Sequence, residues 1–140
     1  MIEPIIREYP IQDNDFTHAG EASSNMKKAL TRLGVNPASI KRAAIAMYEA
    51  EINAVIHAHG GVAVVHIYPD AVTIEIIDHG PGIPDVDQAM KEGFSTAPDT
   101  AREMGFGAGM GLPNMKKHAD SLEIETAVGV GTKVTLHIKF

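Results

Sequence analysis

Apolar and polar residues alternate in several short stretches of the chain, a pattern typical of β-strands that bury one face. In one stretch, Val72, Ile74 and Ile76 fall on one face, with a threonine and a glutamate between them on the other. The predicted strands are an edge strand over 4–11 bounded by prolines, a hairpin made of 62–68 and 71–77, and strands over 122–126 and 132–139.

Apolar residues at helical spacing predict three helices. The first begins near Thr17 and stops at Gly34, because glycine commonly ends a helix. The second has Asn36 as its N-cap and Pro37 in its first turn, and it runs to about His57. The third covers 112–120. The buried stripe predicted for the second helix consists of Ile45, Ile52 and Ile56.

Each clear strand has one apolar and one polar face, so we expect a sheet that helices cover on one side only. The predicted fold class is α/β: a two-layer sandwich of a mixed, mostly antiparallel sheet with its helices on one face. A length of 140 residues suits a single domain over 1–140.

Composition narrows the function classes. The net charge of −6 does not favour nucleic acid or an anionic membrane as a partner. The chain has no cysteine, which excludes disulfides and thiolate metal sites and fits the reducing cytoplasm. It shows neither a signal-peptide pattern nor a run of 18 apolar residues, so we expect no secretion and no membrane span.

The stretch from Asp78 to Leu112 carries the strongest chemical signal. Asp78 follows directly on a predicted strand, where its short carboxylate can point into a pocket. Glycine then stands at every second position from Gly105 to Gly111, so backbone N–H groups can surround an anion. The helix that follows, with Pro113 in its first turn, adds a helix N-terminus. These features together predict a nucleotide site.

Two familiar nucleotide motifs are excluded. No glycine run continues into the Gly-Lys-Ser/Thr of a P-loop, and the glycine spacing does not fit the dinucleotide fingerprint. A flexible loop is the alternative interpretation of the glycine run taken by itself.

The second predicted helix carries the other polar group. Glu49, Asn53 and His57 are four residues apart, so they line one flank of the helix. The Asn53 oxygen suits Mg²⁺, and Glu49 can accept a proton from an incoming hydroxyl or water. A solvated helix face is the alternative for this pair alone. His57 and His59 point in different directions on a helix, which argues against a transition-metal site.

Four motifs occur in an order that resembles a known family: Glu49–Ala54, Asp78–Ile83, Gly105–Leu112 and Gly129–Thr132. They are similar to the nucleotide-binding boxes of the ATPase fold shared by gyrase B, Hsp90, histidine kinases and MutL. Within it, the chain most resembles the bacterial anti-sigma and switch-type protein serine kinases, over about 17–140.

The resemblance implies a role for each matching residue. Asp78 accepts a hydrogen bond from the adenine amino group, and Thr132 supports it through a water. Asn53 ligates Mg²⁺, and Glu49 is the catalytic base. The implied nucleotide-binding residues are Asn53, Asp78, Gly80, Gly82, Ile83, Gly105, Gly107, Ala108, Gly109, Met110, Gly111, Leu112 and Thr132.

The resemblance also implies a lid, placed at about 84–110, that closes over the nucleotide. Lys91 and Arg102 are the candidates for a contact with the γ-phosphate. Implied partners are an antagonist-type regulatory protein with a STAS-like fold as phosphoacceptor, and a sigma factor or a phosphatase; a homodimer is left open.

Two functions follow. The first is transfer of the ATP γ-phosphate to a serine or threonine of a partner protein, and the second is an ATP-gated protein-binding module with little or no transfer. Glu49 favours the kinase, since a passive binder needs no base. A histidine-kinase catalytic domain is disfavoured, because the chain has no room for a helical dimerisation domain.

Overall fold

A computed structural model describes residues 3–11, 19–57, 60–83 and 111–140. In chain order the elements are β1 (Ile5–Ile11), α1 (Glu21–Arg32), α2 (Pro37–His57), β2 (Gly61–Ile67), β3 (Ala71–Asp78), α5 (Gly111–His118), β4 (Ser121–Ala127) and β5 (Gly131–Lys139).

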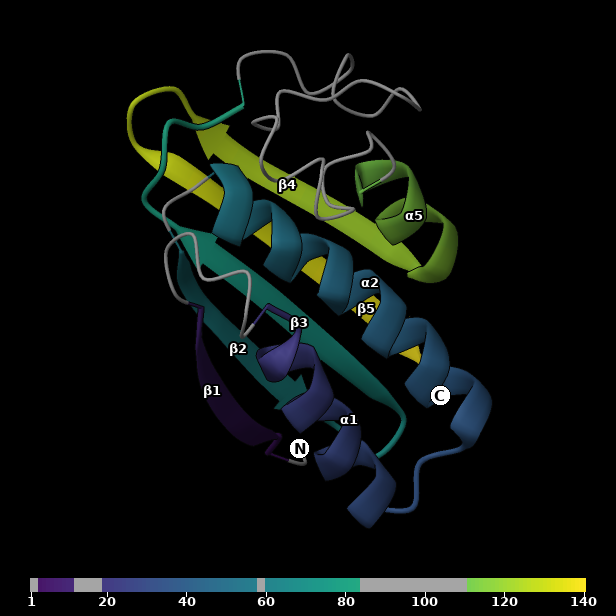
Figure 1. Ribbon diagram of the computed structural model, residues 1–140. Helices are drawn as coiled ribbons and strands as arrows, with labels where there is room; N and C mark the ends of the chain where they lie inside the picture. The colour runs from purple at the N-terminus through teal and green to yellow at the C-terminus, as the bar shows by residue number, and fades with distance from the viewer. Residues whose placement is uncertain (1–2, 12–18, 58–59, 84–110) are drawn as a thin grey trace.

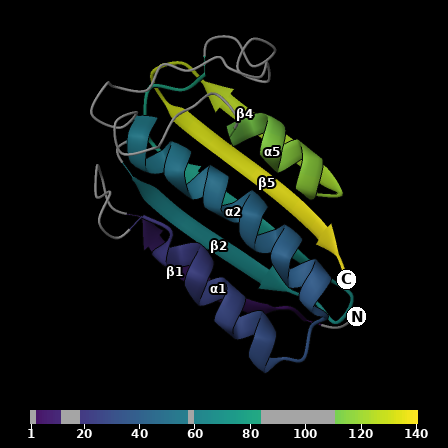
Figure 2. The same cartoon turned by 45° about the vertical axis from the view of Figure 1, so that its right-hand side comes forward.

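The strands form one sheet in the order β1-β2-β3-β5-β4, and every neighbouring pair is antiparallel. The three described helices lie on one face of this sheet, with α2 between α1 and α5 (Figures 1 and 2). The predicted two-layer α/β sandwich is confirmed. No helix in the described ranges is both long and apolar enough to cross a membrane.

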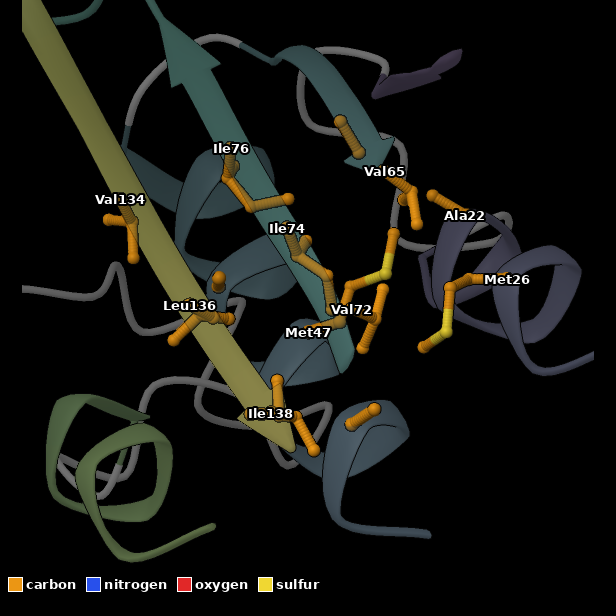
Figure 3. Close-up of a cluster of buried hydrophobic side chains, with 14 of the residues drawn as sticks. Ala22, Met26, Met47, Val65, Val72, Ile74, Ile76, Val134, Leu136 and Ile138 are labelled. Carbon is orange, nitrogen blue, oxygen red and sulfur yellow. The ribbon is translucent and has the colours of Figure 1, made fainter. Parts of the chain in front are cut away.

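The core fills the space between the sheet and the helices (Figure 3). Met26 of α1 and Met47 of α2 are fully buried against the apolar face of the sheet. That face consists of rows across neighbouring strands, such as Ile74 beside Leu136 and Val72 beside Ile138. The alternation of apolar and polar residues along the strands therefore predicted correctly which face of the sheet the helices cover.

Two details of the helices were predicted wrongly. Helix α1 begins at Glu21 rather than near Thr17, because Gly20 has a left-handed φ of 94° that no helix accommodates. Ile45 is only half-buried, whereas Ile52 and Ile56 are buried as predicted. More than half of the α2 residues in the core cluster are alanines: the cluster takes Ile40, Ala43, Ala46, Met47, Ala50, Ala54 and Val55 from this helix.

The uncovered face of the sheet carries a cross-strand polar cluster. Glu75 of β3 accepts a hydrogen bond from Lys133 of β5 at 2.7 Å and pairs with His66 of β2 at 2.8 Å. The hydrogen bond from the Lys133 ammonium lowers the pKa of the Glu75 carboxyl; partial burial opposes this shift and His66 adds to it. Opposite charges on neighbouring strands thus stabilise the central pairings of the sheet.

Candidate functional site

The end of β3, the β4–β5 turn and the C-terminal end of α2 lie at the same end of the molecule (Figure 1). This end holds most of the described residues that the sequence singled out. They fall into two groups, one on α2 beside α5 and one on the sheet.

The α2 group consists of Glu49 and Asn53. Both side chains are half-buried, one helical turn apart on the same flank. Asn114 of α5 donates a hydrogen bond from Nδ2 to Glu49 Oε1 at 3.3 Å, so this flank faces α5. The Glu49 carboxylate thereby keeps Oε2 without a hydrogen bond inside the described part of the chain. The role of Asn114 was not predicted.

Glu51, two residues from Glu49, has a different environment and was missed by the sequence analysis. Its side chain is only 2% exposed. Oε2 accepts the N–H groups of Gly20 and Ala22 at 3.0 and 3.1 Å, and Oε1 accepts that of Ser23 at 3.0 Å. These donors are the free N–H groups at the start of α1, where a carboxylate also complements the helix dipole. Glu51 is therefore a structural cap, and Glu49 is the carboxylate available for chemistry.

The sheet group is a polar row at the end of the apolar rows. Asp78, Thr132 and Thr126 are direct neighbours across β3, β5 and β4. The adjacent row on the same face, two residues away on each of these strands, is apolar and consists of Ile76, Val134 and Ile124. The polar row is thus where the apolar face of the sheet stops.

Asp78 is 8% exposed and has its carboxylate fixed by the backbone. Oδ1 accepts N–H groups from Gly80 at 3.0 Å and from Thr132 at 3.1 Å. Both lone pairs of Oδ1 are then used, and within the described ranges Oδ2 has no hydrogen-bond partner. The N–H of Thr132 thus contacts Asp78 directly, and the water-mediated support of adenine that the resemblance implies for Thr132 stays a prediction.

Two glycines bring the surrounding backbone close to this row. Gly82 has a φ of 81°, and a Cβ there would lie 2.6 Å from the Ala127 carbonyl oxygen. Gly131 has a φ of 145°, and its Cβ would lie 2.2 Å from the carbonyl oxygen of Asp78. Only glycine fits at either position, so the Asp78–Ile83 loop and the β4–β5 turn pack backbone to backbone.

The remaining sequence-predicted residues are only partly described. Gly111 begins α5 and Leu112 follows it, with Pro113 in the first turn as predicted. The cradle and lid residues Gly105, Gly107, Ala108, Gly109, Met110, Lys91 and Arg102 lie outside the described residues.

The two groups offer complementary chemistry. The Asn53 carboxamide oxygen is a hard donor that suits Mg²⁺, and the Glu49 carboxylate one turn away can accept a proton. On the sheet, Asp78 Oδ2 presents an acceptor that is fixed in position and matches an amino group. Together they suit a ligand with an amino-bearing base at one end and a metal-bound phosphate at the other.

Comparisons with known proteins agree with this geometry. Residues 38–140 match the family described as histidine kinase-, DNA gyrase B-, and HSP90-like ATPase. An anti-sigma F factor of Clostridium beijerinckii is 39% identical over 101 residues, which cover 68% of this chain and 67% of that protein. The serine/threonine-protein kinase RsbT of Bacillus subtilis is 39% identical over 57 residues, 41% of this chain and 37% of that protein.

Among solved structures, the fold resembles part of the structure of the RsbU and RsbW domains of a Mycobacterium tuberculosis protein, with a TM-score of 0.61 at 17% identity. That match covers 97% of this chain and 33% of the other. Since the family match spans most of the chain and contains every described site residue, the chain belongs to the histidine kinase-, DNA gyrase B- and HSP90-like ATPase family.

Proposed function

We propose that this protein is an ATP-dependent protein serine/threonine kinase of the anti-sigma or switch type. The adenine amino group donates to Asp78 Oδ2. Asn53 would hold Mg²⁺, which would supply positive charge to the phosphates when bound. Leu112 and the residues before it contribute to the phosphate-binding end, where α5 begins.

Glu49 is the proposed base. In the transfer, the hydroxyl oxygen of a serine or threonine bonds to the γ-phosphorus as the bond from that phosphorus to ADP breaks. The hydroxyl proton passes to the Glu49 carboxylate, and Asn114 holds that carboxylate through Oε1.

One observation supports the kinase function most directly. Glu49 and Glu51 lie two residues apart on α2, and only Glu51 caps another helix. Glu51 accepts three backbone N–H groups, while Glu49 accepts one side-chain hydrogen bond and lies one turn from Asn53. A protein that only bound ATP would need no such carboxylate beside its metal ligand.

The proposed partner is a regulatory protein, with an antagonist-type STAS-like protein as the phosphoacceptor and a sigma factor or phosphatase as a second partner. The relatives named as an anti-sigma F factor and a serine/threonine-protein kinase support this class of partner. The proposed location is the cytoplasm, where ATP and such partners are found.

Two substitutions separate binding from transfer. Asn53→Ala should weaken Mg-ATP binding, because the metal loses its protein ligand. Glu49→Ala should leave Mg-ATP binding nearly intact and reduce phosphotransfer roughly 10²- to 10⁴-fold, the usual contribution of a positioned base. Isothermal titration measures the first effect, and transfer from γ-labelled ATP measures the second.

The ATP-gated binding module gives a different pattern. There, Glu49→Ala would change neither binding of Mg-ATP nor capture of the partner, and the partner retained with Mg-ATP would carry no new phosphate. Mapping phosphosites on the retained partner distinguishes the two functions.

A further inference from the structure

The three described helices carry a charge opposite to that of the whole chain. They contain seven lysines and arginines and three glutamates, which gives them a net charge of +4 in a chain of net charge −6. The seven bases are Lys27, Lys28, Arg32, Lys41, Arg42, Lys116 and Lys117. All of these side chains are exposed except that of Arg42, which is half-buried. We refer to the seven residues together as the basic helical face.

The basic helical face lies at the end of the helical layer opposite to the candidate site. Its α1 members lie in the second half of that helix and its α2 members near the start of the next, and residues 33–36 join the two regions. Its α5 members lie in the last turn of that helix. Asp120, two residues after α5, pairs with Arg42 at 3.4 Å, so the end of α5 lies beside the start of α2. Figure 2 shows the three helices side by side.

The glutamates of the helices do not neutralise this face. Glu51 is buried and caps α1, and Glu49 accepts a hydrogen bond from α5 near the candidate site. Glu21 lies at the start of α1, at the other end of that helix from the face. Within the described ranges, Asp120 is the one carboxylate that pairs with any of the seven bases.

The stability of the helices does not explain all of these bases. Those in the last turns of α1 and α5 complement the helix dipole. Lys28 lies four residues before Arg32, a spacing at which like charges on a helix repel each other. Lys41 lies in the second turn of α2, close to the positive end of the dipole, and no acidic residue precedes it in the first turn. Helix stability alone would therefore disfavour Lys28 and Lys41.

We propose that the basic helical face is a docking surface for an acidic surface of a partner protein. Its charge complements such a surface, and Leu33, 50% exposed directly after α1, adds an apolar contact that a protein partner can cover. Nucleic acid and anionic membranes are disfavoured, because the rest of the chain makes the molecule acidic as a whole and repels an extended polyanion.

A partner docked on this face leaves the candidate site accessible. At a rise of 1.5 Å per residue, Lys41 lies about 18 Å along α2 from Asn53. The inference therefore goes beyond the proposed function, because docking here needs neither ATP nor phosphotransfer.

Three lysine substitutions test the proposal. Lys28→Gln and Lys41→Gln each remove one charge from the basic helical face. Lys133→Gln removes one charge from the opposite, uncovered face of the sheet and is the matched control. The probe is a fluorescein-labelled oligoglutamate peptide, and its binding to the full chain is followed by fluorescence anisotropy in low salt without nucleotide. A DNA duplex of the same net charge and vesicles of equal parts phosphatidylcholine and phosphatidylglycerol are the alternative ligands.

We expect the wild type to bind the peptide more tightly than the duplex or the vesicles. Lys28→Gln and Lys41→Gln should each weaken peptide binding about two- to fivefold, the usual effect of losing one exposed ion pair. The double variant should lose roughly the product of the two factors, and Lys133→Gln should match the wild type. Added salt should weaken peptide binding, since ions screen exposed charges.

Three outcomes would overturn the inference. They are no peptide binding by the wild type, equal weakening by Lys133→Gln and Lys41→Gln, and tighter binding of the duplex or the vesicles than of the peptide. None of them affects the proposed kinase function, because the experiment contains no nucleotide and leaves the candidate site unaltered.

Discussion

At the scale of single residues, two glutamates two positions apart on α2 have opposite roles. Glu51 is buried and accepts three N–H groups at the start of α1, whereas the half-buried Glu49 faces α5. Their order in the sequence gives no hint of this difference, because the donors to Glu51 lie 28 to 31 residues earlier. Only the packing of α1 against α2 assigns the roles.

Glu51→Ala should destabilise the fold. It leaves three N–H groups at the start of α1 without their acceptor in a buried setting, and we expect the free energy of unfolding to fall by about 3 kcal/mol. Urea denaturation at pH 7 measures this. Glu49→Ala is the matched control and should stay within about 1 kcal/mol of wild type; equal losses in the two variants would contradict the assignment of Glu51 as the cap.

Gly82 and Gly129 provide a second matched pair. Their φ angles are 81° and 80°, but a Cβ at Gly82 would meet the Ala127 carbonyl at 2.6 Å, and one at Gly129 would meet nothing within 4 Å. Both alanine substitutions incur the left-handed penalty of roughly 1–2 kcal/mol. Gly82→Ala should lose about 2 kcal/mol more, because backbone must move. Thermal unfolding of both variants compares them, and equal losses would mean that the close approach at Gly82 is not tight.

At the scale of the elements, the covered face of the sheet was predictable because alternation is a local property of the sequence. Val72, Ile74 and Ile76 share a face in any strand, and the structure buries all three. The start of α1 was not predictable. It depends on Gly20 and on a cap from Glu51 of another helix.

The site shows the same division. Asp78 was predicted from its place at a strand end, and Glu49 and Asn53 from their spacing on a helix. Thr126 and Asn114 were missed, because their significance comes from register between β4 and β5 and from the contact of α5 with α2. The sequence does show that Thr126 precedes Thr132 by six residues. That spacing places the two threonines side by side only once the position of the β4–β5 turn is known.

The cross-strand cluster on the open face predicts a pH dependence. The Lys133 hydrogen bond lowers the folded-state pKa of Glu75, so the ion pair stabilises the fold above the unfolded-state pKa of about 4.3. That contribution is lost as the pH falls through the lowered folded-state value. Because the Lys133 side chain is 39% exposed, solvent screens the ion pair and the expected contribution to the free energy of unfolding is small.

Glu75→Gln tests this expectation. It should lower the free energy of unfolding at pH 7 and differ little from wild type near pH 3, as measured by urea denaturation at both values. The effect should also shrink in high salt, since solvent ions screen an exposed charge. A difference that is the same at both pH values would point to lost packing rather than lost charge.

At the scale of the whole molecule, the sheet and α2 supply the two ends of one proposed site. The polar row lies where the apolar face of the sheet ends, and it is the proposed binding place of adenine. The Glu49–Asn53 flank faces α5 and is the proposed binding place of the phosphates. The family match over 38–140 includes both groups. We infer that this arrangement transfers a phosphate to a partner protein, rather than only binding ATP.

The most direct test is single-turnover transfer from γ-labelled Mg-ATP to the partner captured with Mg-ATP, comparing wild type with Glu49→Ala at saturating nucleotide. We expect wild type to place the label on a serine or threonine of the partner. With Glu49→Ala the rate should be at least about 100-fold lower, although both proteins bind Mg-ATP equally. Equal transfer by the two proteins, or a captured partner that never acquires label, would contradict this inference.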